Sequence, residues 1–436
     1  MRHLRGSMVS TLALAALVGC EDGNGAPDGA VMPSAPAGAE VVRSSRARIT
    51  ASAAPAEDLQ ALARGNAEFG LALYRAVGAE AGNVVMSPHS VSVALGMTWA
   101  GARTETETQM ASALRFSMGQ ARTHAAFNAL DLALAQRAMR PVDGGGQRFR
   151  LRVVNSLWGQ RGYRFLTPFL DTLGEHYGAA MYLVDFVRDA EGARGVINTW
   201  VSTQTERRIP ELLPMGVVRP TTVLVLTNAV YFSASWAQPF PAGDTRPADF
   251  HLLDGSTRSA PTMNRVAELR YAEGPSWQAV ELPYVGEEVS MLVIVPAEGR
   301  FAEVERGLDG AALTAVVAGL HPRRVTLSLP RFSFRKPAGL REPLRAMGMT
   351  DAFSSSADLS GMDGTRSLFI QDVLHEGYIA VDEAGTEAAA ATAVIIGRVS
   401  APEPATLRAD RPFLFAIRDN PTGAVLFFGR VVEPSR

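Results

Sequence analysis

Residues 382–404 read DEAGTEAAAATAVIIGRVSAPEP, and they combine signals that no single secondary structure satisfies. Consecutive alanines at 388–391 favour a helix, because alanine has the highest helix propensity. The mostly β-branched run at 392–396 favours a strand. Gly397 and Pro402 then punctuate the chain as in an exposed loop. Taken alone, the segment is open to two interpretations: a short helix that leads into a surface loop, or a segment with a role that neither a helix nor a linker fills.

The start of the chain has the features of an export signal. Basic residues Arg2 and Arg5 precede an apolar run, Met8–Val18, which is too short to span a bilayer in the mature protein. The run ends in Leu-Val-Gly-Cys, which resembles a bacterial lipobox, and Cys20 is the only cysteine of the chain. We therefore predict that residues 1–20 are a signal peptide and that Cys20 is lipidated, with no intrachain disulfide. The expected location is the membrane of a bacterial cell envelope, or the exterior if the protein is secreted.

The next segment, residues 21–57, is rich in Gly, Ala, Pro and Ser and has few large apolar side chains. Such a composition buries too little surface to fold, so we predict a flexible tether followed by one folded domain at 58–436. Charge is balanced over the chain, with 42 Lys and Arg against 44 Asp and Glu. Because the basic residues are scattered, the sequence predicts no binding of nucleic acid.

Helices are expected early in the domain and strands later. Apolar residues recur with helical spacing over 58–77 and 189–204, whereas Val289–Pro296 is a nearly continuous apolar run typical of a covered strand. The alternation of apolar residues changes parity across Pro330, which predicts a bulge or bend. Residues 411–431 read as two apolar strands around an Asn-Pro-Thr-Gly turn. Helices and strands that do not alternate regularly indicate an α+β fold.

Motifs that would mark an enzyme are missing from the sequence. The seven histidines form no closely spaced metal-ligand pair, and the chain has neither a Gly-x-Ser-x-Gly elbow nor a phosphate-binding loop. Acidic residues show no pattern of paired general acid and base. We therefore expect neither an enzyme nor a cofactor.

Collinear segments of the chain resemble the serpins, the family with the serine protease inhibitor fold. The matching segments include NVVMSPHSVSVAL at 83–95, INTWVSTQTERRIPELLP at 197–214, TNAVYFSASWAQPF at 227–240, HEGYIAVDEAGTEAAAATA at 375–393 and RPFLFAIRDNPTGAVLFFGRV at 411–431. The resemblance implies a monomer with three β-sheets, about nine helices and an exposed reactive loop at about 383–404.

This resemblance implies that the protein is an irreversible inhibitor, whose reactive loop contains a hinge and is attacked by the protease as a substrate. A protease attacks a loop bond and forms an acyl-enzyme, and the cut loop then inserts into the main sheet and traps the protease. Serine endopeptidases are the expected targets, with cysteine endopeptidases as a second class. The residues implied to form the hinge are Glu383, Gly385, Thr386, Glu387, Ala388, Ala389, Ala390, Ala391 and Thr392.

The hinge composition suits a segment that is exposed first and buried later. Because side chains alternate along a strand, Thr386, Ala388, Ala390 and Thr392 would share one face, and Glu387 would lie on the other. A buried charge would be costly on the first face, which carries only small residues. Large or charged hinge residues would instead indicate the alternative function, a non-inhibitory serpin that acts as a binding or chaperone-like module.

Two sets of residues complete the implied site. Positions around the opening point of the main sheet are implied for Ser87, Asn228, Trp236 and His375. His375 is open to two interpretations, a pH-sensitive latch or a buried histidine with satisfied hydrogen bonds.

The attacked bond also has two candidates. Counting fourteen residues from Gly385 gives Val399–Ser400, which suits an elastase-like protease. Counting back from the C-terminal hairpin gives Arg398–Val399, which suits a trypsin-like protease. Basic residues are interspersed with acids over 104–139, so we expect no activation by a polyanion.

Overall fold

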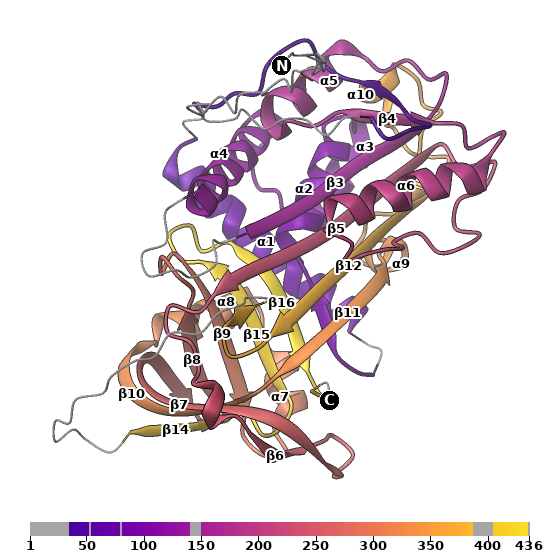
Figure 1. Ribbon diagram of the computed structural model, residues 1–436. Helices are drawn as coiled ribbons and strands as arrows, with labels where there is room; N and C mark the ends of the chain where they lie inside the picture. Colours follow the sequence, from indigo (N-terminus) through magenta and orange to yellow (C-terminus); the bar gives the residue numbers. More distant parts are fainter. Residues whose placement is uncertain (1–34, 52–53, 79–80, 140–149, 387–403, 435–436) are drawn as a thin grey trace, which may run out of the picture. The chain divides into compact units, whose positions relative to one another are not determined.

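The computed structural model describes residues 35–51, 54–78, 81–139, 150–386 and 404–434 (Figure 1). Its α-helices are α1 (Ala56–Val77), α2 (Pro88–Trp99), α3 (Thr104–Ala113), α4 (Gln120–Met139), α5 (Thr167–Thr172), α6 (Ala190–Gln204), α7 (Phe301–Gly307), α8 (Gly310–Ala318), α9 (Arg341–Ala346) and α10 (Ser360–Asp363). A π-helical turn, η1 (Leu173–Tyr177), continues α5. Among the described residues, no helix is both long and apolar enough to cross a membrane.

Sixteen strands accompany these helices in the described part of the chain. They are β1 (Glu40–Val42), β2 (Val84–Met86), β3 (Arg150–Gln160), β4 (Met181–Val184), β5 (Leu224–Ser235), β6 (Arg246–His251), β7 (Thr257–Gly274), β8 (Trp277–Pro283), β9 (Val289–Pro296), β10 (His321–Pro330), β11 (Phe332–Gly339), β12 (Asp372–Val381), β13 (Gly385–Thr386), β14 (Ala405–Arg408), β15 (Phe413–Asp419) and β16 (Val425–Val431). Helices dominate before β5 and strands after it, so the predicted α+β class is confirmed.

Local signals in the sequence explain where two of the helices begin. Ser87 precedes α2, and its side chain accepts a hydrogen bond from the backbone N–H of Ser90 at 3.1 Å. Asp189 precedes α6 and accepts from the N–H of Gly192 at 2.8 Å. Both side chains satisfy a backbone donor that the first helical turn leaves free.

The main sheet has seven strands in the order β1-β4-β3-β5-β13-β12-β11. Helix α6 crosses one face of this sheet in front of β3 and β5, and α2 lies behind it (Figure 1). Successive residues of β12 show the two faces: Leu374 packs in the apolar cluster with Ile197 and Trp200 of α6, whereas His375 contacts the residue that caps α2. The sheet is therefore covered on both sides, and its strands are mostly apolar.

The second sheet has nine strands, eight of them in the order β14-β10-β7-β8-β9-β15-β16-β2, with β6 paired to β7. Strand β7 belongs to two groups, because its residues 257–271 pair with β6 and β10 and its residues 270–274 pair with β8. Counted by hydrogen bonds, the described residues form two sheets. The division of the larger one at β7 gives the three groups of strands that the sequence resemblance implied.

The change of parity at Pro330 marks a passage between the two sheets. Strand β10 ends at Pro330 in the nine-stranded sheet, and β11 begins at Phe332 in the seven-stranded sheet. The intervening Arg331 donates its backbone N–H to the carbonyl of Pro261 at 2.8 Å. At the predicted bend, the chain therefore passes from the nine-stranded sheet to the seven-stranded one. This also places the side chain of Arg331 beside Glu383 of the hinge.

One boundary prediction is wrong. The predicted tether extended to Glu57, but Glu40–Val42 pairs with β4 as the edge strand of the main sheet. The guanidinium of Arg48 donates from Nε to Oδ1 of Asn128 at 3.0 Å, and the backbone N–H of Ile49 donates to the carbonyl of Glu175 at 3.0 Å. Composition did not reveal this attachment because a strand of three residues is specified by its partner's free edge.

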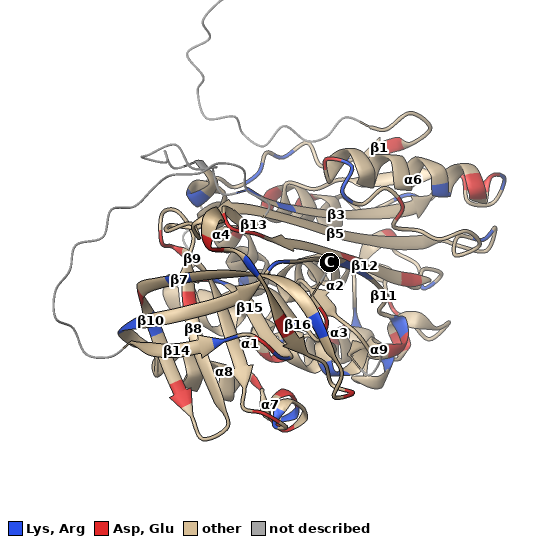
Figure 2. Cartoon of the chain, turned by 60° about the horizontal axis from the view of Figure 1, so that its bottom comes forward, with Lys and Arg blue, Asp and Glu red and all other residues tan. Residues whose placement is uncertain are grey.

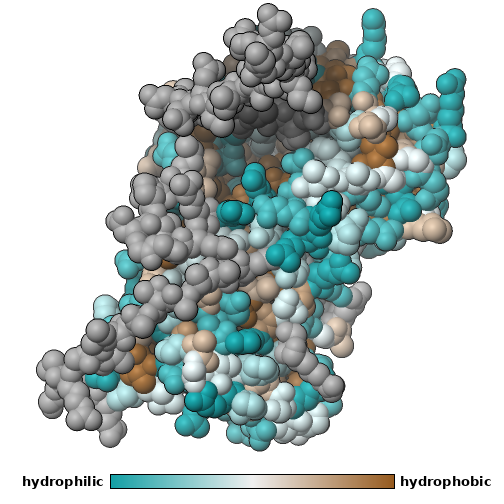
Figure 3. All heavy atoms as spheres, in the orientation of Figure 1, coloured by the Kyte–Doolittle hydropathy of each residue, from teal (hydrophilic) through white to brown (hydrophobic). Residues whose placement is uncertain are grey.

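In the described residues that Figures 2 and 3 show, charged and apolar residues are distributed in small groups. Positive and negative side chains are interspersed over the strands and helices in Figure 2. The face in Figure 3 is mainly hydrophilic, with apolar residues in small separate groups. Large apolar side chains that remain exposed in the described residues, such as Val187, Met215 and Leu253, come from different connecting segments.

Candidate functional site: the gap beside strand β5

Strands β5 and β12 pair over only part of their length. They run parallel, and residues 372–377 of β12 are in register with residues 225–230 of β5. Beyond Gly377 the two strands separate, and β13 lies between them. Gly385 pairs with Ser235 and Thr386 with Ala234, while Thr386 also pairs with Val381 of β12. The main sheet is therefore already parted at this end, and two hinge residues occupy the gap.

For the described hinge residues, Glu383, Gly385 and Thr386, this placement corrects the expectation that the hinge is exposed before cleavage. Thr386 has no exposed surface, Glu383 is 9% exposed, and Gly385 is also buried. Where β5 and β12 diverge, each would leave backbone donors and acceptors without a partner inside the protein. The short strand β13 satisfies some of these groups, which explains why the hinge enters the sheet.

A buried polar cluster lies beneath the zone where β5 and β12 still pair. The backbone N–H of Ser87 donates to Nε2 of His375 at 3.2 Å, and Nδ1 of His375 contacts Oδ1 of Asn228. The amide Nδ2 of Asn228 donates to Oγ of Ser90 at 2.6 Å and also bonds to Oδ1 of Asn155. Three of the four predicted gating residues, Ser87, Asn228 and His375, are thus in contact and join α2 to both strands.

The contacts of His375 fix its protonation. Because Nε2 accepts a backbone N–H, the proton of the neutral ring must lie on Nδ1, where it is donated to Asn228. Complete burial lowers the pKa of His375 from 6.5 to about 3. The geometry therefore favours the second interpretation of this residue, a buried histidine with satisfied hydrogen bonds.

The fourth predicted gating residue, Trp236, lies at the other end of the gap and holds the hinge backbone. Its indole Nε1 donates to the carbonyl of Asp382 at 3.0 Å, and its backbone N–H donates to the carbonyl of Ala384 at 2.9 Å. The carboxylate of Asp382 in turn accepts from the N–H groups of Ala384, at 2.9 Å, and Gly385, at 3.2 Å. The chain turns into β13 through these bonds.

Gly385 is needed in this turn for space. A Cβ atom there would lie 2.1 Å from the carbonyl oxygen of Ala234, which is backbone and cannot move aside easily. The hinge glycine predicted from the sequence thus permits close approach to β5.

Glu383 binds the hinge to Arg331, which lies between β10 and β11 where the chain passes from one sheet to the other. Nε of Arg331 donates to Oε1 of Glu383 at 2.8 Å, and the hydroxyl of Thr245 donates to the same oxygen. Burial raises the pKa of Glu383, but the hydrogen bonds from Arg331 and Thr245 outweigh it and leave the pKa below its usual value. Glu383 is therefore held as a carboxylate at neutral pH.

Sequence reasoning did not single out Tyr284, which also contacts the hinge. Its hydroxyl and that of Thr386 are 2.7 Å apart, and its ring stacks on Trp236 with centroids separated by 4.5 Å. The aromatic residue directly after β8 was visible in the sequence, but its contact depends on a residue 102 positions later.

The other predicted site residues lie outside the described residues. These are the hinge positions Glu387, Ala388, Ala389, Ala390, Ala391 and Thr392, the candidate bond residues Arg398, Val399 and Ser400, and the lipidation residue Cys20.

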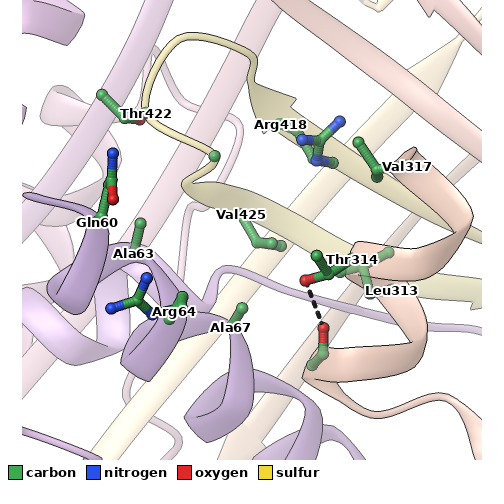
Figure 4. A pocket seen from close by; sticks show the side chains of 12 residues that line it. Gln60, Ala63, Arg64, Ala67, Leu313, Thr314, Val317, Arg418, Thr422 and Val425 are labelled. Atoms are coloured by element: carbon green, nitrogen blue, oxygen red, sulfur yellow. Dashed lines mark hydrogen bonds between the residues drawn. The ribbon is translucent and has the colours of Figure 1, made fainter.

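A separate cavity of about 220 Å³ lies between α1, α8 and the β15–β16 hairpin (Figure 4). Ala63, Leu313 and Val425 line it together with the polar side chains of Arg64 and Arg418. None of these residues contributes to the hinge contacts above. Among the described residues, no group of three or more His, Cys, Asp or Glu side chains is placed to hold a metal ion.

Comparisons with known proteins place the chain in a family. The model of the serpin family, described as serine protease inhibitors, matches residues 64–434. The chain belongs to the serpin family. An uncharacterized serpin-like protein of Thermococcus kodakarensis is 39% identical over 370 residues, which cover 84% of each chain. The leukocyte elastase inhibitor of Sus scrofa is 37% identical and aligns over 86% of this chain and 100% of its own.

Solved structures agree with this serpin assignment. Uncleaved ovalbumin superposes with a TM-score of 0.76 at 28% identity, over 86% of this chain and 100% of its own. The thermophilic serpin tengpin in its native state gives a TM-score of 0.77 at 27% identity, over 90% of this chain and 97% of its own. The serpin fold predicted from the resemblance is confirmed.

Proposed function

We propose that this serpin is an irreversible inhibitor of serine endopeptidases that traps the acyl-enzyme by inserting its cleaved loop between β5 and β12. The observation that carries the proposal is β13, because two residues of the hinge already form a strand in that gap. The loop continues directly from Thr386, so insertion would lengthen an existing strand.

The pairing pattern supplies a physical reason for insertion to be favourable. Strand β13 is antiparallel to both β5 and β12, whereas those two strands are parallel to each other. Full insertion would replace six parallel residue pairs with two antiparallel ladders, and antiparallel pairing is somewhat more stable. Bond cleavage would free the loop from its C-terminal attachment and allow this exchange.

The side chains of the hinge fit the same path. Thr386 is buried against Tyr284, so alternation would place Ala388, Ala390 and Thr392 on the same buried face. Glu387 would lie on the opposite face of the new strand. Small side chains on the buried face would let the strand advance quickly relative to hydrolysis of the acyl-enzyme.

Two protease classes are proposed as targets, one for each candidate bond. Attack at Arg398–Val399 would suit a trypsin-like protease, and attack at Val399–Ser400 would suit an elastase-like one. Several similar curated proteins carry the name leukocyte elastase inhibitor, which makes an elastase-like enzyme the first one to test.

The test is incubation of the protein with a trypsin-like and an elastase-like protease, followed by denaturing electrophoresis and mass measurement of the released C-terminal fragment. We expect a complex that resists denaturation, with a fragment that begins at Val399 or at Ser400. A protease whose catalytic serine is chemically blocked serves as the control and should give no complex. Turnover of the loop without any complex would contradict the proposal and favour a non-inhibitory binding module.

We also propose a location for the protein. The lipobox-like sequence supports export and attachment to a membrane of the cell envelope through lipidated Cys20. We also propose that a single copy is the working unit. A Cys20→Ser variant should be soluble or unprocessed while the parent chain partitions with membranes. Equal retention of both in the membrane fraction would refute the anchor.

A further inference from the structure

Tyr284 lies where the hinge enters the main sheet. It follows β8, forms an isolated β-bridge with Trp236, and is completely buried. Its ring stacks on Trp236 at an interplanar angle of 10°, and it meets Phe232 of β5 edge to face, with centroids 5.1 Å apart. These aromatic contacts fix the ring, so the position of its hydroxyl is set before the loop moves.

The hydroxyl of Tyr284 has a partner in the hinge. It is 2.7 Å from Oγ1 of Thr386, and neither side chain has exposed surface. Burial raises the pKa of Tyr284 above its usual value, so the phenol keeps its proton. In the described structure, this hydrogen bond attaches the side chain of Thr386, the second residue of β13, to the body of the protein.

We propose that Tyr284 is a positioning residue for loop insertion, which holds Thr386 between β5 and β12 so that the new strand grows from a formed end. This inference rests on the proposed function and names the residue that sets its first step. Without the bond, the hinge would leave the gap more often, and each insertion would have to begin by pairing Gly385 and Thr386 again.

The energetics of buried hydroxyls predict an unusual pattern among variants. Tyr284→Phe leaves the Thr386 hydroxyl buried without its partner, and Thr386→Val leaves the Tyr284 hydroxyl in the same state. Either change should raise the population of the expelled hinge by about tenfold, since an unpaired buried polar group is costly. When both changes are combined, no hydroxyl is left unpaired and the shapes are nearly kept, so the double variant should resemble the parent.

Hydrogen exchange measures the population of the expelled hinge without any protease. Peptides that cover residues 381–386 should exchange about tenfold faster in each single variant and within about twofold of the parent in the double variant. Tyr378→Phe is the matched control, because Tyr378 lies on β12 and its hydroxyl bonds to Ser333, not to the hinge. Unchanged exchange in the single variants, or exchange in the double variant as fast as in the singles, would overturn the proposal.

Trapping experiments connect the bond to function. With a protease that the parent traps, Tyr284→Phe and Thr386→Val should each require several-fold more inhibitor per protease, and the double variant should restore the parental ratio. Equal ratios in the parent and in Tyr284→Phe would refute the positioning role while leaving the proposed function intact. Failure of the parent to trap any protease would instead refute the proposed function, and the exchange data would still decide whether the bond holds the hinge.

Discussion

The two sides of strand β5 differ in how firmly they are closed. Toward β3, β5 pairs antiparallel over ten consecutive residues, from Leu224 to Ser233. Toward β12, it pairs parallel over six residues and then receives β13. The β5–β12 interface is thus parallel, incomplete and already occupied at one end by the hinge, and it is where the proposed insertion would add a strand.

Polar side chains add to this difference. Beneath the β5–β12 interface lies the cluster of Ser87, Asn228 and His375, whose hydrogen bonds would have to be exchanged if the proposed insertion parted the strands. The closed side also has polar contacts, such as that of Ser156 with Thr227 at 2.6 Å, but these link strands that stay paired. This set of hydrogen bonds lies at the side of β5 that the proposed insertion would open.

The largest expected effect comes from locking one side of β5 or the other. Ala229 is in register with Glu376 of β12 on one side and with Val154 of β3 on the other. A disulfide between Ala229→Cys and Glu376→Cys should prevent insertion and convert the protein to a substrate, with trapping restored by reduction. Strands in register bring Cα atoms to distances that a disulfide can span.

The matched control keeps the cysteine at position 229 and changes its partner. A disulfide between Val154→Cys and Ala229→Cys should leave trapping essentially unchanged, because β3 and β5 stay paired. Both variants carry Cys20→Ser to prevent mispairing. Trapping that survives the β5–β12 disulfide, measured on non-reducing denaturing gels, would place the insertion elsewhere.

A large effect is also expected from a charge in the gap. Thr386→Arg places a guanidinium at a completely buried position, which costs several kcal/mol unless the hinge leaves the sheet. The variant should be cleaved by the protease without forming a complex, and its hinge peptides should exchange rapidly. Complex formation at the parental ratio would argue against burial of this residue during trapping.

A smaller effect is expected from pH. Burial lowers the pKa of His375 from 6.5 to about 3. Between these two pH values, His375 is therefore protonated in the unfolded chain and neutral in the folded protein. The stability that this residue contributes is complete above pH 6.5 and is lost as the pH falls toward 3. As the pH falls between those limits, the free energy of unfolding of a His375→Gln variant should decrease by about 1.4 kcal/mol less per pH unit than that of the parent, as measured by denaturant unfolding. His89 and His124 are also buried with lowered pKa values and stay as a common background in both proteins. Identical pH dependence of the two proteins would contradict the assignment.

The sequence predicted the fold and much of the site because several signals were local. Ser87 and Asp189 cap helices through bonds to residues three positions away. The family resemblance then supplied Trp236, His375 and the hinge, which no local pattern would have connected. The change of parity at Pro330 was visible, although its consequence, the delivery of Arg331 to Glu383, was not.

Other features depend on distant partners and escaped prediction. Strand β1 has three residues and exists because β4 offers a free edge. The burial of Thr386 follows from the divergence of β5 and β12, which neither strand shows in its own sequence. Tyr284 gains its role through a single hydroxyl contact across the fold. In each case the structure depends on two segments that are distant in the sequence, and neither segment alone predicts it.

Insertion of the loop as a strand between β5 and β12 is tested most directly by a comparison of the intact and the loop-cleaved protein. The measurement is the melting temperature before and after one cut within residues 387–403, with the cut verified by mass. Insertion should raise the melting temperature markedly, since even a gain of about 5 kcal/mol corresponds to a rise on the order of 10 °C. The same cut in the protein locked between Ala229→Cys and Glu376→Cys should give little change until the disulfide is reduced. A melting temperature that stays the same after cleavage of the unlocked protein would contradict the account.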